Sequence, residues 1–117
     1  IKNKKGSIVY ISSSSALDGN EGRNAYSSTK AAIIAQAKVL SREVGVHNIR
    51  VNSVAPGLTN TDMMKENHKK EIIKDVISRT SLRRIANPEE IANVVLLLSS
   101  DLTSYITGQV IRVDGGM

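Results

Sequence analysis

The chain has 117 residues, a formal net charge of +5 and no cysteine. It is long enough for one small domain with a modest hydrophobic core. Without cysteine there is no disulfide frame and no thiolate metal centre, and two scattered histidines give no basis for expecting a metal site. The longest apolar run, residues 94–98, is far shorter than the roughly 18 residues of a membrane span. We therefore expect a cytoplasmic protein without a membrane partner.

The positive charge suits either an anionic partner such as nucleic acid or a lysine-rich surface. The chain has no Phe or Trp to stack on bases and no recognisable nucleic-acid-binding module. We therefore expect no nucleic-acid partner. His47 and His68 are isolated in polar surroundings, and we interpret both as solvated surface residues. The run that begins at Ile1 has neither a helix-start signal nor a secretory signal, so the chain is interpreted as a fragment.

The first half of the chain predicts one strand and one long helix. Residues 7–11 form a short apolar run, which is typical of a strand buried on both faces of a parallel sheet. The serines at 12–15 and the turn residues at 18–22 predict a loop. Residues 25–44 are mostly helix formers with apolar positions at helical spacing, and Gly45 is placed to end this helix.

The second half predicts a strand, an irregular segment, a helix and a third strand. Residues 50–55 form the second strand, which Pro56 and Gly57 terminate. Residues 58–87 are polar and predicted to be mobile, with a helical patch at 71–77.

The last predicted helix opens with an N-cap at Asn87 and a proline at the first helical position, and it runs through Leu98. Residues 109–113 then form the third strand. This order predicts an α/β fold with right-handed crossovers and a parallel sheet. Ligands bind such sheets beyond the carboxyl ends of the strands, where Ser13 and the Pro56-Gly57 turn would both emerge.

Tyr26 and Lys30 lie four positions apart at the start of the long helix, so their side chains share one face. A phenol ordinarily titrates near pH 10, but a neighbouring ammonium stabilises the phenolate. Tyr26 could then act as a general acid or base. By spacing alone the two residues could equally be an ordinary surface pair. Ser13 could donate a hydrogen bond to a carbonyl oxygen, or it could simply be a loop residue.

Five stretches resemble, in the same order, motifs of the short-chain dehydrogenase/reductase family, particularly the branch that looks like β-ketoacyl-acyl-carrier-protein reductase. They are residues 6–13, 25–32, 50–57, 88–92 and 105–116. The resemblance implies a Rossmann-like, doubly wound parallel sheet. Residues 1–117 would be the C-terminal part of one such domain, with its last three strands and their helices. The family's glycine-rich first turn and its catalytic asparagine would lie upstream, so the fragment alone is expected to be inactive.

The resemblance also implies an activity and a set of site residues. The activity is hydride transfer between NAD or NADP and a small-molecule carbonyl or alcohol, in a homo-oligomeric enzyme. The family's serine lies thirteen residues before its tyrosine, which selects Ser13. Tyr26 would transfer the proton, Lys30 would also bind the nicotinamide ribose, and Ser13 would polarise the carbonyl. Further residues at the nicotinamide end would be Pro56, Gly57, Thr59 and Thr61, and residues 62–82 would form a substrate lid.

Two alternatives remain open from the sequence. Sugar-nucleotide epimerases and dehydratases share the tyrosine-lysine pair, although the Pro56-Gly57 turn and the ending at 114–116 favour a reductase. A non-catalytic fragment of a dinucleotide-binding fold is the second alternative.

Overall fold

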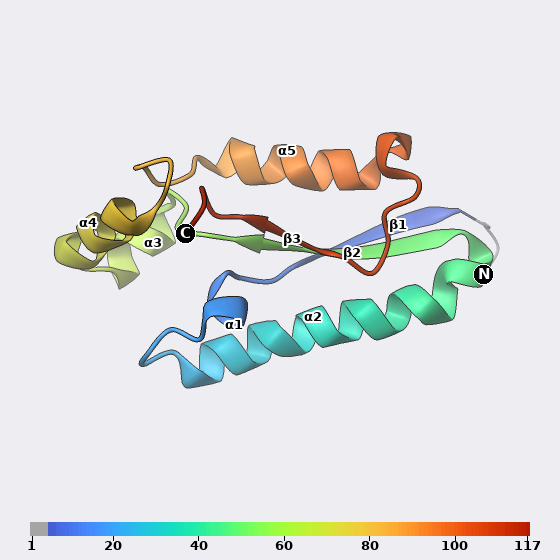
Figure 1. Ribbon diagram of the computed structural model, residues 1–117, viewed down its shortest axis with the longest axis horizontal. Coiled ribbons are helices and arrows are strands. Elements are labelled where there is room, and N and C mark those ends of the chain that lie inside the picture. The colour runs from blue at the N-terminus through green and yellow to red at the C-terminus, as the bar shows by residue number, and fades with distance from the viewer. Residues whose placement is uncertain (1–4) are drawn as a thin grey trace.

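The computed structural model describes residues 5–117. The expectation of a fragment is drawn from the start of the chain, which lies outside these residues. One three-stranded parallel sheet is present, in the order β1 (Gly6–Ile11), β2 (Ile49–Pro56), β3 (Val110–Val113). The long helix α2 (Asn24–Val44) covers one face of the sheet, and α5 (Pro88–Ser99) covers the other (Figure 1). This layered arrangement confirms the predicted α/β fold with a parallel sheet.

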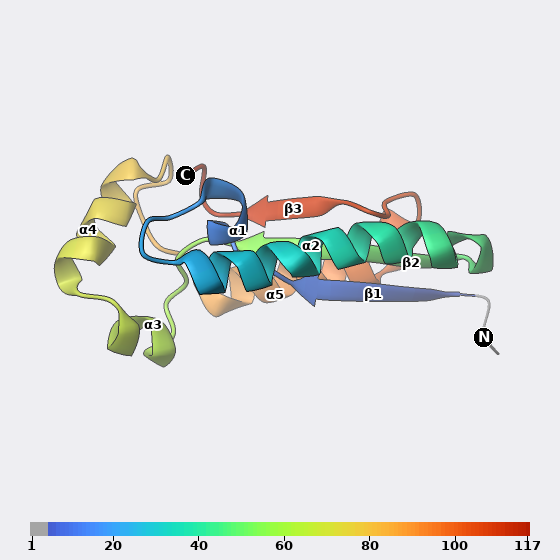
Figure 2. The same cartoon turned by 90° about the horizontal axis from the view of Figure 1, so that it is seen from below.

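The centre of the fold is β2, which lies between β1 and β3 (Figure 2). Ile8 of β1 is paired in register with Val51, and Ile111 of β3 is paired with Val54. Val51, Val54 and the neighbouring Ala55 are completely buried. Burial on both faces favours the small and β-branched apolar residues at these positions.

Asn52 is a polar residue in the middle of this buried strand. Its side-chain amide donates to the carbonyl oxygen of Ile106 at 2.9 Å, and its Oδ1 accepts from the backbone amide of Gln109 at 3.0 Å. In the same segment, Oγ1 of Thr107 accepts a hydrogen bond from the backbone amide of Val51 at 3.0 Å. These bonds attach the segment before β3 to β2, and they satisfy polar groups that would otherwise be buried without partners.

The expectation that the first strand is buried on both faces is wrong for this structure. Among the described residues β1 pairs with β2 alone and forms an edge of the sheet. Ile8 is 37% exposed and Ile11 is 44% exposed. The apolar run therefore indicates a strand correctly, but the layers around it cover it only in part.

The two long helices follow the prediction closely. α2 begins one residue before the predicted start and ends at Val44, and α5 begins at Pro88 as predicted. At the start of α5 the carboxylate of Glu90 accepts from the backbone amide of Asn87 at 2.9 Å, as in a capping box. Within residues 5–117, no helix combines the length and the apolarity needed to cross a membrane.

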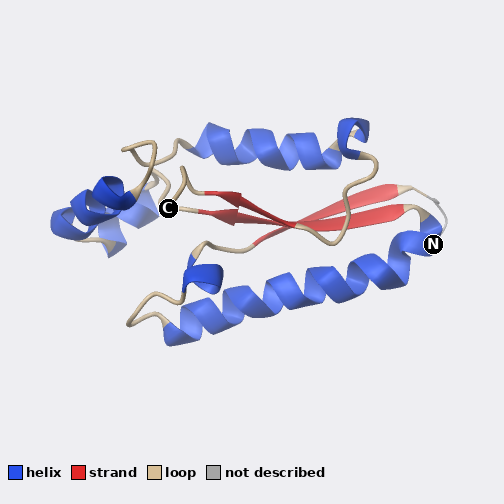
Figure 3. Cartoon of the chain, in the orientation of Figure 1, coloured by secondary structure: helices blue, strands red, loops and turns tan. Residues whose placement is uncertain are grey.

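Two short helices, α1 (Ser15–Asp18) and α3 (Asp62–Asn67), form where the sequence predicts a loop or an irregular segment. A third, α4 (Lys70–Arg79), confirms the predicted helical patch at 71–77 and extends it at both ends. α1 is a single turn that ends at Gly19 in the left-handed conformation, and α3 begins where the Thr61 side chain accepts from the amide of Met64. Both α3 and α4 lie beyond the carboxyl ends of the strands (Figure 3).

Replacing Asn52 with alanine should destabilise the protein. Ile106 keeps a hydrogen bond from Arg50, but the amide of Gln109 loses its side-chain acceptor. An orphaned buried donor costs about 1–3 kcal/mol, so we expect the free energy of unfolding to fall by about 2 kcal/mol in urea titrations. The control is Asn93→Ala on the exposed face of α5. Equal stability of the two variants would contradict this account of Asn52.

Candidate active site

The segments that leave the three strands stay hydrogen-bonded beyond the strand ends. Ser14, after β1, donates its backbone amide to the carbonyl of Pro56 at 2.9 Å, and Gly57 donates to the carbonyl of Val113 at 2.9 Å. The Ser13 segment and the Pro56-Gly57 turn are therefore neighbours at the carboxyl edge of the sheet. This is the edge at which parallel sheets bind ligands.

Each of three neighbouring serines after β1 has a different environment. The Ser12 hydroxyl donates to the carbonyl of Lys30 at 2.8 Å, and the Ser15 hydroxyl accepts from the side-chain amide of Asn20 at 3.1 Å. The Oγ of Ser13, which is buried, accepts from the amide of Ser15 at 3.2 Å. Since that bond uses only a lone pair, the hydroxyl proton of Ser13 stays available for another acceptor.

The structure brings Tyr26 and Lys30 together in the first turns of α2. The Nζ of Lys30 lies 5.9 Å from the centroid of the Tyr26 ring and donates to the carbonyl of Ile11 at 3.1 Å. The ammonium is thus attached to the last residue of β1. The Tyr26 side chain is 44% exposed, so its phenol is accessible to a ligand.

Arg23, just before α2, is a neighbour of Tyr26 that sequence reasoning missed. Its Cζ lies 5.8 Å from the ring centroid, and its Nη2 lies 2.6 Å from Nε2 of His68. Nδ1 of His68 lies 3.1 Å from the carbonyl of Met64, so Nδ1 donates while Nε2 accepts from Arg23. The interpretation of His68 as a solvated surface residue is wrong, whereas His47 is exposed as expected. No local pattern indicates a contact between residues so distant in sequence.

The Pro56-Gly57 turn packs tightly against the end of β3. A Cβ atom on Gly57 would lie 2.8 Å from the Cα of Asp114, so the turn requires glycine. Thr59 forms a parallel bridge with Ala86. In this bridge the amide of Ala86 donates to the carbonyl of Leu58, and the carbonyl of Ala86 accepts from the amide of Asn60. The amide and carbonyl of Thr59 therefore point away from this bridge.

Thr61 occupies a structural position at the start of α3. Its Oγ1 accepts from the amide of Met64 at 3.1 Å, which caps the helix. The hydroxyl proton of Thr61 is not used by this bond.

A second polar cluster, also missed by sequence reasoning, surrounds Arg112 on β3. Its Nη1 and Nη2 donate to the two carboxylate oxygens of Asp18 at 2.8 and 2.9 Å, and its Nε donates to Asp114 at 2.7 Å. Burial alone would raise the pKa of Asp114, but the bonds from Arg112 and from the amide of Gly116 outweigh it and lower that pKa. The same two carboxylates raise the pKa of Arg112.

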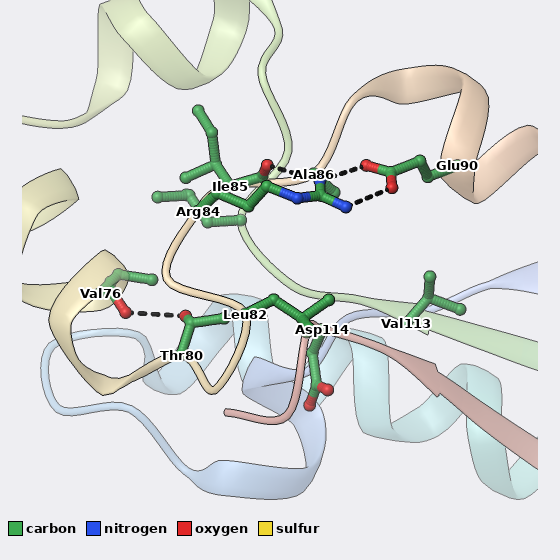
Figure 4. Close-up of a pocket in the computed structure, with 11 residues that line it drawn as sticks. Val76, Thr80, Leu82, Arg84, Ile85, Ala86, Glu90, Val113 and Asp114 are labelled. Carbon is green, nitrogen blue, oxygen red and sulfur yellow. Dashed lines mark hydrogen bonds and ion pairs between the residues drawn. The ribbon is translucent and has the colours of Figure 1, made fainter.

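A small cavity lies between β3 and the segment that follows α4, and not beside Tyr26. Its volume is about 90 Å³, well below the roughly 300 Å³ of a typical ligand pocket. The side chains of Val76, Leu82 and Ile85 line it, and the forked ion pair between Arg84 and Glu90 stands at its rim (Figure 4). We interpret the cavity as a packing defect under the loop. Within residues 5–117, no group of three His, Cys, Asp or Glu side chains could hold a metal ion.

Glu90 is the carboxylate with the clearest electrostatic shift. Hydrogen bonds from the Arg84 guanidinium and then from the amide of Asn87 lower the pKa of Glu90 from 4.5 to about 2. Its pKa is therefore lower in the folded protein than in an unfolded chain. The stabilisation is fully present above about pH 4.5 and is lost as the pH falls toward 2.

Glu90→Gln should therefore reduce the acid sensitivity of the protein. Between about pH 4.5 and 2, the melting temperature of the variant should fall less steeply than that of the wild type. Thermal melts across this range measure the effect, with Glu89→Gln at the exposed neighbouring position as control. Parallel melting curves for the wild type and the Glu90 variant would contradict the assignment.

Comparison with known proteins agrees with this geometry. A sequence profile of the family described as Enoyl-(Acyl carrier protein) reductase matches residues 1–117. The 3-oxoacyl-[acyl-carrier-protein] reductase of Chlamydia trachomatis is 51% identical over 120 residues, which cover 100% of this chain and 47% of that protein. A 3alpha-hydroxysteroid dehydrogenase of Mediterraneibacter gnavus is 43% identical, over 94% of this chain and 44% of its own length.

A solved structure gives the same result in three dimensions. A 7α-hydroxysteroid dehydrogenase complexed with NADH and 7-oxo glycochenodeoxycholic acid is 37% identical, with a TM-score of 0.95 over 98% of this chain and 45% of that one. A Rossmann-like α/β arrangement is thereby established for the described residues. The chain belongs to the short-chain dehydrogenase/reductase family. It spans about half the length of the curated relatives it matches, 47% of the Chlamydia protein.

Proposed function

We propose that this chain is the C-terminal part of an oxidoreductase domain that transfers a hydride between NAD or NADP and a small-molecule carbonyl or alcohol. The observation that carries the proposal is the arrangement of Tyr26 and Lys30. The ammonium of Lys30 lies 5.9 Å from the Tyr26 ring centroid and is attached to the end of β1, while the phenol remains accessible. The family membership of the chain supports the same reaction class.

In this proposal Tyr26, Lys30 and Ser13 divide the chemistry between them. Tyr26 donates a proton to the carbonyl oxygen during reduction and accepts it during oxidation. The positive charge of Lys30 stabilises the phenolate that is left after the donation. Ser13 donates its unused hydroxyl proton to the same substrate oxygen and so stabilises the charge that develops there.

The residues around this site fit the nicotinamide end of a dinucleotide. The Lys30 ammonium has three N–H donors and uses one to bind the carbonyl of Ile11. Two donors are left for the hydroxyl groups of a ribose. The backbone amide and carbonyl of Thr59, which point away from the bridge with Ala86, match the carboxamide. Pro56 and Gly57 would shape the pocket, and Thr61 would contribute its hydroxyl. When bound, the nicotinamide supplies or receives the hydride.

We further propose that residues 62–82 form the substrate lid. Met63 is 70% exposed on α3 and offers an adaptable apolar contact, whereas Met64 is buried and anchors this helix. The related proteins include a 3-oxoacyl-[acyl-carrier-protein] reductase and a hydroxysteroid dehydrogenase. Both names describe enzymes that act on a carbonyl group or on the corresponding alcohol. This supports a reductase rather than an epimerase.

The surface of α2 supports a homo-oligomer. Val39 is 57% exposed, and it forms a shallow apolar surface with Ala35 and Leu40. A second copy of the protein would remove this surface from water in a symmetric dimer or tetramer. We propose a cytoplasmic location, because the reaction draws on the nicotinamide cofactor pool.

Tyr26→Phe should abolish most of the activity of the full-length protein. Loss of a positioned acid lowers kcat by at least about a hundredfold, whereas cofactor affinity should change little. Turnover is followed by the absorbance of the reduced nicotinamide. Tyr105→Phe, at a fully exposed tyrosine, is the matched control and should keep wild-type kcat. Near-normal turnover by the Tyr26 variant would refute the proposed role.

Lys30→Met should lower kcat and cofactor affinity together, because one ammonium is proposed to stabilise the phenolate and to bind the ribose. Loss of a charge-assisted hydrogen bond should weaken cofactor binding by about tenfold or more in calorimetric titrations. Lys38→Met, at an exposed position of the same helix, is the control. Unchanged cofactor affinity in the Lys30 variant would exclude the ribose contact.

A further inference from the structure

We propose that Arg112 is a positioning residue for Ser13, holding the turn that orients this serine against the turn at the nicotinamide end. The proposal rests on the function proposed above for Ser13. Arg112 is on β3 and does not belong to the serine, tyrosine and lysine set, so its contribution acts through other residues.

The guanidinium of Arg112 joins two parts of the site that are far apart in the sequence. It binds both carboxylate oxygens of Asp18, 94 positions earlier in the chain, and one oxygen of Asp114. The side chains of Arg112, Asp18 and Asp114 are 35%, 30% and 8% exposed, so the cluster is partly removed from water. Salt screens such a cluster less than the fully exposed pairs elsewhere on the surface.

On one side, the bond to Asp18 controls the environment of Ser13. Asp18 is the last residue of α1, and Ser15 is the first. The amide of Ser15 donates to the Oγ of Ser13 and thereby orients the hydroxyl. α1 has a single turn, and so short a helix has little stability of its own. Attachment of its last residue to β3 therefore keeps the Ser15 amide, and with it the Ser13 hydroxyl, in place.

On the other side, the bond to Asp114 fixes the turn that contacts Gly57. The backbone of Asp114 packs so closely on Gly57 that no Cβ fits between them. The second oxygen of Asp114 accepts from the amide of Gly116 at 3.1 Å, which closes the turn after β3. Arg112 thus links Ser13 to the Gly57 turn. A shift of either segment would change the distance between the Ser13 hydroxyl and the nicotinamide.

The planar fork of arginine is essential to this arrangement. Three N–H donors of one guanidinium reach two carboxylates simultaneously, with parallel bonds to both oxygens of Asp18. A lysine ammonium has no such fixed fork. Arg112→Lys therefore retains the charge but loses the geometry, and Asp18→Asn retains the size of the side chain but replaces one acceptor oxygen with a donor.

The test uses the full-length protein and measures kcat for each substitution in two backgrounds. In the wild type, Arg112→Lys and Asp18→Asn should each lower kcat by about ten- to a hundredfold, with a smaller change in the KM of the cofactor. In a Ser13→Ala background, Asp18→Asn should cause no further loss, because the serine that it positions is absent. Arg112→Lys should cause a smaller loss there than in the wild type, because it still releases the Asp114 side chain that fixes the Gly57 turn. Asp101→Asn, which breaks the exposed Lys5–Asp101 pair, is the control and should leave kcat unchanged in both backgrounds.

The background comparison separates positioning from general stability. If Arg112→Lys and Asp18→Asn lower kcat as much in the Ser13→Ala background as in the wild type, the proposal is overturned. Unchanged kcat in the wild-type background would also overturn it. Should Ser13→Ala itself leave kcat unaltered, the proposed role of Ser13 fails, and the positioning role fails with it. Asp18→Asn keeps the test decisive if Arg112→Lys does not fold.

Discussion

The parallel pairing of β2 with a strand on each side is the constraint on which this structure depends. Because all three strands run in the same direction, their carboxyl ends lie at one edge, and the hydrogen bonds continue past the strand ends into Ser14 and Gly57. The burial of Val51 and Val54 stabilises this pairing. The Asn52 side chain holds the segment that leads into β3 against β2. The Ser13 segment, the Pro56-Gly57 turn and, through its bond to Ile11, Lys30 lie at this edge as a result, although they come from separate segments.

The regular elements of this fold can be predicted from the sequence because each has a strong local cause. Residues 50–55 include β-branched Val51 and Val54 and are followed by the strand-ending Pro56-Gly57, and Asn87 with Pro88 begins a helix by capping and by restricting the backbone. The short helices were less predictable. A single turn such as α1 forms because Gly19 and the tertiary bond from Arg112 end and anchor it, and neither cause is periodic. The exposure of Ile8 likewise depends on which strands lie beside β1.

The candidate site was predictable to the extent that it follows local spacing and a family resemblance. The four-residue spacing of Tyr26 and Lys30 places both side chains on one helix face, and the structure has them together. Their proposed roles remain predictions. The contacts of Arg23 with His68 and of Arg112 with Asp18 connect residues distant in the sequence, and they depend on the tertiary arrangement of loops. The carbonyl of Ile11 as the partner of Lys30 is equally a product of strand and helix packing.

The position of α3 and α4 beyond the strand ends has a consequence for the divergence of this protein. Among residues 5–117, the side-chain hydrogen bond between the segment that joins these two helices and the residue before α2 is that between His68 and Arg23. The Lys30–Ile11 bond and the buried strand β2 do not involve α3 or α4. Insertions, deletions and substitutions in the two helices would therefore leave the Lys30–Ile11 bond in place and reach Tyr26 only through Arg23. If the proposed function is correct, the same tyrosine and lysine would serve carbonyl compounds of very different shape.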